Sequence, residues 1–523
     1  MLNTRPWAAV LVMMFGAAMP VAALAADDVA ALRAEIEALK SDYAQTVASL
    51  EARISQLEAG TPRADRAAPA AANQAPAAAA QSERPPAATG AGETAVPAAG
   101  GASESVAALQ AEAAAAGFAQ SPPTPAAPDY SGAGPSSGGA RGGQSAFNPA
   151  ISMILAGNYG HLSQDPNTYR IAGFIPSGGE VGPGERSFNL GESELTVAAN
   201  VDPYFFANVT ASVTSDNEIA VEEAYFRTLA LRDGFTVKGG RFFSGLGYLN
   251  EIHAHAWDFV DQPLVYQAFF GGQLTQDGLQ AKWLAPTDTF IELGAEAGNG
   301  GAFPGTHRNR NGRNATTLFA HVGGDVGDST SWRTGVSWLD DKADDRAYED
   351  TDAFGVPVVN AFTGTSRTWG LDAIMKWAPH GDAVNRQLKL QAEYLHRTED
   401  GQLAFDTTGA NIGGDYRSSQ SGWYVQSVYL FRPRWRVGLR YDSMDSGDPH
   451  IGTVASGLLT RNEFPTLLAN SPDRVTLMVD WSPSEFSRLR AQYAWDDARL
   501  DQRDRQFLIQ YLYGIGAHGA HKF

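Results

Sequence analysis

The stretch Arg434-Trp435-Arg436-Val437-Gly438-Leu439-Arg440-Tyr441-Asp442 decides the fold class. Its odd-numbered positions from Trp435 to Tyr441 are apolar or aromatic, and its even-numbered positions are charged or small. Successive side chains of a β-strand point to opposite faces, so this stretch has one face suited to lipid and one suited to water. Two-sided strands of this kind indicate an all-β, transmembrane antiparallel β-barrel.

The same alternation recurs along residues 148–523. It predicts approximate strands at 150–160, 188–200, 203–213, 218–230, 234–244, 275–284, 287–297, 315–323, 328–338, 365–378, 386–398, 420–432, 434–446, 473–482, 485–496 and 503–523. The count is about sixteen, and an even number is expected when both ends of a bacterial barrel lie in the periplasm. Most connections predicted on one side are short, whereas those on the other side include long loops at 161–187, 245–274, 298–314, 339–364, 399–419 and 447–472. This asymmetry is typical of an outer-membrane barrel.

Three segments are predicted before the barrel. Residues 1–25 join an early positive charge, an apolar run and the small-residue motif Ala23-Leu24-Ala25, which indicates a secretory signal peptide. Residues 27–59 lack Gly and Pro and carry a heptad row, which predicts a periplasmic α-helical coiled coil or, alternatively, one amphipathic helix; the row is Ile36, Tyr43, Leu50 and Leu57. A coiled coil would favour a homotrimer. Residues 60–147 are rich in Ala, Pro, Gly and Ser, which predicts a disordered linker.

Composition narrows the function classes. The chain has no cysteine, so a disulfide framework or a thiolate metal site is not available. A formal net charge of −19 argues against a nucleic-acid partner, because phosphate binding needs a cationic surface. The Gly-x-Ser-x-Gly match at 134–138 falls in the predicted linker, without the strand and helix that a nucleophile elbow needs. An enzyme is therefore not expected.

The last predicted strand carries a terminal aromatic residue in phase with its apolar row. The residues that share this parity are Phe507, Ile509, Tyr511, Tyr513, Ile515 and Phe523. A terminal aromatic on the lipid-facing row resembles the signal that the outer-membrane barrel assembly machinery recognises. Lipid, lipopolysaccharide and that machinery are therefore the expected partners, with the N-terminal region in the periplasm.

The loop 245–274 is too apolar to extend into water. It follows the fifth predicted strand, and in position and length it resembles the loop that folds into the lumen of general porins and forms their constriction. Glu251, Asp258 and Asp261 would then place negative charge at the narrowest point. The alternative is an ordinary packed outer loop.

Arginines are expected to form a basic pore wall on the late strands. The inward positions are Arg434, Arg436, Arg440, Arg474, Arg488 and Arg490. An acidic loop that faces a basic wall would set a transverse field across the pore and influence ion preference. Alternatively, these arginines pair with the loop carboxylates. A separate acidic run predicts an outer loop that is either solvated or collects divalent cations; it contains Asp340, Asp341, Asp344, Asp345, Glu349, Asp350 and Asp352.

Two histidines offer a possible metal site. His253 and His255 fall on one side of an extended segment, and with Asp258 they could supply two or three Zn²⁺ ligands in the constriction. The alternative is that they form hydrogen bonds within the folded loop. His518 and His521 are three residues apart, so on a continuous strand they face opposite sides and cannot chelate together.

The segments Gly240 to Gly245, Tyr248 to Asp261 and Gly516 to Phe523 resemble a proteobacterial family of porin-like outer-membrane barrels. Its members are often labelled zinc-regulated TonB-dependent outer-membrane receptors, so the resemblance implies a link to zinc. The chain departs from a TonB-dependent receptor because no plug domain is recognisable before the barrel and about sixteen strands are too few. The coiled coil and linker also resemble periplasmic extensions of some substrate-selective porins.

The sequence therefore predicts an outer-membrane, porin-type channel for small hydrophilic solutes or ions, constricted by the loop 245–274. The alternative is a zinc-linked, receptor-like uptake protein for a metal or a metal complex. No cofactor is expected except for a possible Zn²⁺.

Overall fold

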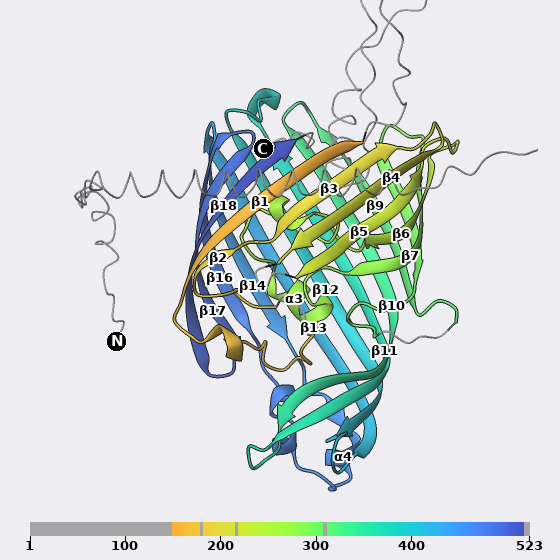
Figure 1. The fold of residues 1–523 in the computed structure, drawn as a ribbon, viewed down its shortest axis with the longest axis vertical. Helices are drawn as coiled ribbons and strands as arrows, with labels where there is room; N and C mark the ends of the chain where they lie inside the picture. Colours follow the sequence, from red (N-terminus) through yellow and green to blue (C-terminus); the bar gives the residue numbers. More distant parts are fainter. Residues whose placement is uncertain (1–148, 178–180, 215–217, 307–310, 517–523) are drawn as a thin grey trace, which may run out of the picture. The chain divides into compact units, whose positions relative to one another are not determined.

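The computed structural model describes residues 149–177, 181–214, 218–306 and 311–516 (Figure 1). Their strands form one sheet of 18 strands, of which β2 (Ser187–Leu190) and β15 (His450–Ile451) are short. The sixteen others close into an antiparallel barrel, because β1 pairs with both β3 and β18. The predicted fold class and strand number are confirmed. The signal peptide, the coiled coil, the linker, His518, His521 and Phe523 lie outside the described residues.

The barrel strands are β1 (Ala150–Leu162), β3 (Ser193–Asn200), β4 (Phe205–Val213), β5 (Ile219–Thr228), β6 (Phe235–Phe243), β7 (Thr275–Leu284), β8 (Phe290–Gly298), β9 (Ala315–Val326), β10 (Thr330–Thr351), β11 (Pro357–Trp377), β12 (Gln387–Phe405), β13 (Ile412–Arg432), β14 (Trp435–Asp445), β16 (Asp473–Ser484), β17 (Ser487–Arg499) and β18 (Gln502–Gly516). Short helices lie in the connections: η1 (Pro166–Thr168), η2 (Ala254–Ala256), α3 (Leu264–Phe270), η3 (Pro379–Gly381), α4 (Gly452–Ala455), η4 (Arg461–Glu463) and η5 (Pro465–Leu467). Among the described residues, none of these helices is long and apolar enough to cross a membrane.

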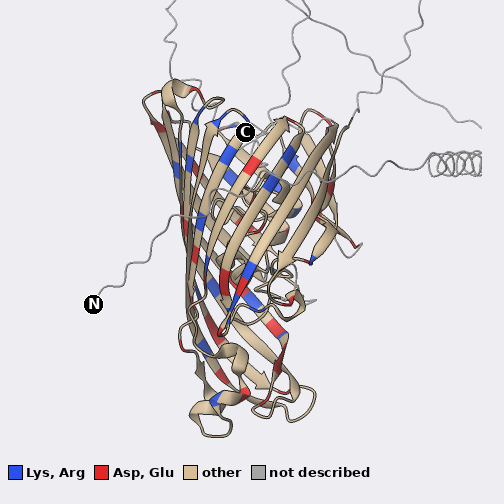
Figure 2. Ribbon diagram, turned by 90° about the vertical axis from the view of Figure 1, so that its left-hand side faces the viewer, with Lys and Arg blue, Asp and Glu red and all other residues tan. Residues whose placement is uncertain are grey.

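The two faces of the strands follow the predicted alternation. On β14, Trp435 and Leu439 are exposed outward, whereas Arg440 is buried inside. Trp435 lies opposite Trp481 of β16, with the two rings stacked at 5.8 Å, and Leu439 lies opposite Leu477. Charged residues occur on the strands in short bands between uncharged positions (Figure 2). The exposed apolar and aromatic side chains of the outer face suit contact with lipid.

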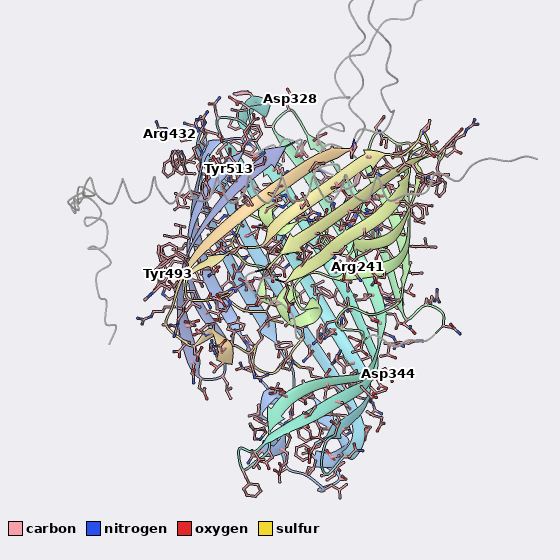
Figure 3. All side chains as sticks on the ribbon, in the orientation of Figure 1. Arg241, Asp328, Asp344, Arg432, Tyr493 and Tyr513 are labelled. Atoms are coloured by element: carbon pink, nitrogen blue, oxygen red, sulfur yellow. The ribbon has the colours of Figure 1, made fainter. Side chains whose placement is uncertain are left out.

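The two ends of the barrel differ. One end, here the turn end, has connections as short as 433–434 and 485–486, and Figure 3 shows Asp328 and Arg432 there. The other end, the loop end, carries the longest connections and α4 (Figure 1). Figure 3 also shows Tyr493 and Tyr513 on the outer surface, where Tyr513 is 42% exposed. This places the described part of the final row, up to Ile515, on the outer face.

The predictions of two outer loops are wrong. Residues 339–364 and 399–419 are mostly strand, because the β10–β11 and β12–β13 hairpins continue beyond the other strands at the loop end (Figure 1). Apolar side chains on the inner faces of these hairpins pack into a cluster with Phe464 and Leu467; they include Ala343, Tyr348, Phe362, Leu403 and Tyr416. The acidic run therefore lies on β10, except for Asp352 in the turn that follows it. On β10, Asp341 is buried, and Asp340 pairs with Arg367 at 2.8 Å.

Candidate functional site

The loop 245–274, between β6 and β7, crosses the inside of the barrel. At one end the amide of Gly245 donates to Glu296 of β8, with a distance of 2.8 Å. Farther along, the carbonyl of Trp257 accepts from Arg490 of β17 at 2.5 Å. Since β8 and β17 lie on opposite sides of the closed strand order, the loop spans the lumen.

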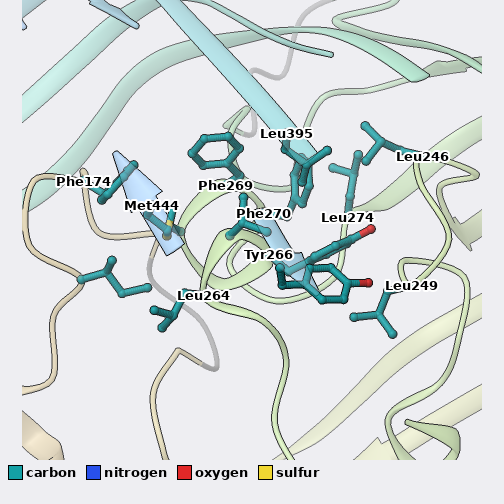
Figure 4. Close-up of a cluster of buried hydrophobic side chains, with 14 of the residues drawn as sticks. Phe174, Leu246, Leu249, Leu264, Tyr266, Phe269, Phe270, Leu274, Leu395 and Met444 are labelled. Carbon is teal, nitrogen blue, oxygen red and sulfur yellow. The ribbon is translucent and has the colours of Figure 1, made fainter. Parts of the chain in front are cut away.

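Apolar packing holds the middle of the loop. All seven residues of α3 are buried, and the helix packs against Leu339 of β10, Leu395 of β12 and Met444 of β14. Figure 4 shows the side chains of Tyr266, Phe269 and Phe270 gathered with Leu395 and Met444. Burying one large apolar side chain contributes about 1.5–3 kcal/mol, so this cluster is a strong anchor for the loop.

A buried carboxylate of the wall holds the start of the loop. Glu393 of β12 accepts from the amides of Tyr248 and Leu249, at 3.1 and 3.0 Å. The same carboxylate accepts from the hydroxyls of Tyr266 and Tyr424, at 2.8 and 2.5 Å. The wall therefore satisfies backbone donors that a loop inside a barrel would otherwise leave unpaired.

The loop aspartates contact the basic wall. Asp258 lies 3.0 Å from Lys389 Nζ and 3.3 Å from Arg436 Nη1. Asp261 lies 2.6 Å from Arg474 Nη1 and 3.0 Å from Arg440 Nη2. Burial alone would raise the pKa of both carboxyls, but these cations hold each pKa below its usual value. Both aspartates are therefore charged at neutral pH.

The other arginines of the predicted wall contact different partners. Arg488 and Arg490 of β17 donate to the carbonyl of Trp257, and Arg436 pairs with Asp480 of β16. Arg434 is not part of the wall. It lies exposed in the turn between β13 and β14 with φ +71° and donates to the carbonyl of Pro483 at 2.9 Å. The alternation does not extend to Arg434 because the chain reverses at the preceding residue, Pro433.

Glu251 lies on the other side of the lumen. It is buried, and its carboxyl lies 3.2 Å from Lys282 Nζ of β7. Burial raises the pKa of Glu251 to about 8, against the opposing effect of Lys282. At pH 7 most of this carboxyl is protonated, so Glu251 does not supply the full negative charge that was expected of it.

The two loop histidines contact strand carboxylates. His253 Nδ1 lies 3.3 Å from Glu194 Oε2 and 3.1 Å from Glu222 Oε2, and its Nε2 lies 3.1 Å from Glu223 Oε2. His255 Nδ1 lies 2.7 Å from Glu194 Oε1. Burial opposes a charged His253 ring, yet Glu194 and its neighbours hold the pKa of His253 well above its usual value.

Asp258 is not part of the histidine cluster, contrary to the expected ligand set, because it faces Lys389 and Arg436. The segment is not extended: η2 is one helical turn between His253 and Trp257, and the two imidazole rings stack at 5.8 Å. The carboxylates of Glu194, Glu222 and Glu223 were missed. Their available signal was the doublet Glu222-Glu223, since strict alternation allows only one of two neighbours to face the lumen.

The loop is thus complementary in charge to both sides of the barrel. Its histidines face the carboxylates of β3 and β5, and its aspartates face the cations of β12, β14 and β16. Direct ion pairs therefore connect two features of the sequence, the acidic segment of the loop and the basic wall.

This chain has a relative among known proteins. A protein of Aquifex aeolicus (strain VF5), described as an uncharacterized protein, is 31% identical over 408 residues, which cover 73% of this chain and 81% of the Aquifex protein. The chain belongs to the family of this Aquifex protein. No family model matches the chain. The description of the relative states no activity, so membership of this family does not assign one.

Solved structures of outer-membrane proteins are similar at low identity. A loop L8 deletion mutant of OmpT of Vibrio cholerae is 13% identical, with coverage of 70% of this chain and 99% of that chain and a TM-score of 0.44. The outer membrane channel DcaP of Acinetobacter baumannii is 13% identical, with coverage of 70% and 97% and a TM-score of 0.41. An anion-selective porin from Comamonas acidovorans is 10% identical, with coverage of 70% and 99% and a TM-score of 0.41. At these values the likeness supports no conclusion about activity.

Proposed function

We propose that this protein is an outer-membrane channel of the porin type, through which small hydrophilic solutes or ions diffuse. The observation that carries the proposal is a closed barrel of sixteen strands whose inner face bears ionisable side chains and is crossed by the loop 245–274. A barrel of about eight strands can be filled by side chains, whereas about sixteen strands enclose a water-filled lumen. The apolar outer face supports a place in lipid.

The inner face is polar around much of its circumference. Buried ionisable side chains on the strands include Glu194, Lys238, Lys282, Glu292, Glu296, Arg333, Asp372, Glu393, Arg397, Arg440, Arg474 and Arg490. Such a lining stabilises water and charged solutes in the lumen and opposes apolar ones. We propose that the loop 245–274 is the constriction, with Asp258 and Asp261 on its basic side and Glu251, His253 and His255 on its acidic side.

Conductance across planar bilayers tests the channel. Full-length protein extracted from membranes should give stable open steps, and steps in groups of three would support the homotrimer suggested by the coiled-coil pattern. A variant without residues 246–272 should conduct more, because the crossing loop is gone. Conductance only after removal of the loop would contradict free diffusion. The matched control is Arg434→Gln, a change in the exposed turn that should leave conductance unchanged.

A second candidate is a zinc-linked, receptor-like uptake protein, and the cluster of His253 with three carboxylates is the observation that favours it. In the described residues the lumen is crossed by a loop of the barrel itself, which supports the diffusion channel over a TonB-dependent receptor. Entry of radioactive zinc into the periplasm, measured with and without the proton gradient, separates the two, because only the receptor needs the gradient for passage across the outer membrane.

A further inference from the structure

Three separate parts of the chain bring one cluster of possible metal ligands together. Glu194 comes from β3, Glu222 from β5 and His253 from the loop 245–274. One ligand atom from each of these residues lies within 4.8 Å of the other two. Glu194 is 2% exposed, so this convergence is not a solvated surface run of charges.

The spacing matches that of ligands around a small cation. Zn²⁺ binds imidazole nitrogen and carboxylate oxygen at about 2.0–2.2 Å in a tetrahedron, which places neighbouring ligand atoms roughly 3.3–3.6 Å apart. The separations of His253 Nδ1 from Glu194 and Glu222 are 3.3 and 3.1 Å. Small shifts of these side chains would therefore accommodate the ion.

A hydrogen-bonding role alone leaves the cluster incomplete. His253 Nδ1 carries at most one hydrogen, yet two carboxylates converge on it. Glu222 Oε1 is buried and has no hydrogen-bond partner among the described residues. A bound cation would satisfy both carboxylates and offset the repulsion between them.

A β-bulge directs the adjacent carboxylates to the same imidazole ring. Thr210 of β4 pairs with Glu223 and Ala211 pairs with Val221, so Glu222 is the extra residue in β5. A bulge interrupts the alternation of side chains, and bulges often re-aim a side chain next to a functional site. Here Glu222 reaches His253 Nδ1, while Glu223 reaches Nε2.

Glu223 has the position of a carboxylate that orients a ligating histidine. Its Oε2 lies 3.1 Å from His253 Nε2, and its Oε1 accepts from the amide of Phe243 at 3.2 Å. A metal-bound histidine typically donates its other ring N–H to such a carboxylate, which fixes the tautomer and the orientation of the ring. His253 Nδ1 would then be the coordinating atom.

We propose that Glu194, Glu222 and His253 bind one divalent transition-metal ion of the Zn²⁺ type, with water in the fourth position and Glu223 as the positioning residue. The ion would join the loop 245–274 to β3 and β5, across the lumen from the attachments of Asp258 and Asp261. Only its effect on conductance rests on the proposed channel function; binding itself does not.

Zinc titration of the whole protein tests the site. Full-length protein without a histidine tag is stripped with a chelator in detergent and titrated with Zn²⁺ against a chromophoric competitor. We expect one ion per chain, a more than 100-fold weaker affinity for His253→Asn and Glu222→Gln, and a 10- to 100-fold weaker affinity for Glu223→Gln. Substitution with Co²⁺ should give the visible absorption of a four-coordinate ion with nitrogen and oxygen ligands.

His450→Asn is the matched control. His450 also contacts a carboxylate, Asp415, at 3.0 Å, but the pair is exposed and offers two ligands only, so this variant should bind as the wild type does. Heat-dependent electrophoretic mobility shows whether each variant forms its barrel. No Zn²⁺ binding by the wild type at about 100 µM, or equal affinity in the isosteric Glu222→Gln variant, would overturn the proposal. Zn²⁺ binding without conductance would refute the channel alone.

Discussion

The contact between Asp261 and the basic wall gives the sharpest prediction. Asp261 accepts from Arg440, Arg474 and Gln492, at 3.0, 2.6 and 2.8 Å. Asp261→Asn keeps the shape of the side chain and removes its charge. Arg440 and Arg474 then keep Asp442, and Arg474 keeps Asp496 at 3.7 Å, so two guanidinium groups lose the carboxylate that they share.

The size of the effect follows from burial. The side chains of Asp261 and Arg474 are 9% and 1% exposed, so solvent screens their attraction little. Removing one partner of a buried ion pair costs about 3–5 kcal/mol, and the retained hydrogen-bonding atoms of Asn favour the lower end. At about 1.4 kcal/mol per tenfold change, a loss near 3 kcal/mol raises the open population of this segment roughly 100-fold.

The absence of cysteine from the chain provides a clean assay. Gln262 is 6% exposed, so a Gln262→Cys thiol should react slowly with a small thiol reagent while the segment is closed. Adding Asp261→Asn should raise the labelling rate by about two orders of magnitude. The control is Asp277→Asn, because Asp277 and Arg241 form an exposed pair that is worth about 0–1 kcal/mol.

A rise of less than about threefold, well below the effect expected for a buried pair, would refute this reasoning. It would mean that the apolar packing of α3 alone holds the segment closed. A similar rise in the Asp277→Asn variant would show that the barrel as a whole has loosened, and that the contact of Asp261 with Arg440 and Arg474 is not the cause.

Three further predictions follow from the same structure. First, cations hold the pKa values of Asp258 and Asp261 below the usual value, so their stabilisation is present above the unfolded pKa and is lost only as pH falls through the folded one. The labelling rate of the Gln262→Cys thiol, divided by the rate in the unfolded protein at the same pH, should stay constant from pH 7 down to about pH 5. A rise in this ratio above about pH 5 would contradict the prediction. Second, Arg490→Gln removes a buried lumenal cation, so the reversal potential in a salt gradient should move toward cation selectivity, whereas Arg434→Gln should not move it. Third, Phe362 is 0% exposed in the loop-end cluster, so Phe362→Ala should destabilise the β10–β13 hairpins by about 3–5 kcal/mol and speed their proteolysis while single-channel conductance stays the same.

The sequence predicted the barrel well because each strand carries its own evidence. The stretch 434–442 shows which side chains face lipid, and the structure places Trp435, Val437 and Leu439 on the outer face as predicted. A strand that has lipid on one side and water on the other must alternate apolar and polar side chains. The loops 339–364 and 399–419 were assigned wrongly because strands beyond the lipid layer need no apolar outer row. Their inner faces also mix apolar side chains such as Tyr348 with charged ones such as Asp341, which obscures the pattern.

The candidate site was less predictable because its contacts join distant parts of the chain. Spacing in the sequence paired His253 and His255 with Asp258, which is close along the chain. The structure instead pairs the histidines with Glu194 and Glu222, which contact the loop because it folds into the lumen and because β5 has a bulge. Neither feature has a local signal apart from the Glu222-Glu223 doublet. The prediction that Arg434 belongs to the wall was wrong for the opposite reason, because the local alternation of a strand was extended into a turn.

The crossing of the lumen by the loop 245–274 also sets an order of events during folding. The loop obtains key partners from strands near the end of the chain: Arg474 lies 213 residues after Asp261, and Arg490 lies 233 residues after Trp257. Contacts between such distant residues form late because the intervening chain must first be ordered. An assembling barrel that lacks β16 and β17 therefore offers the loop only the cations of β12 and β14, and the constriction is completed only as the barrel closes.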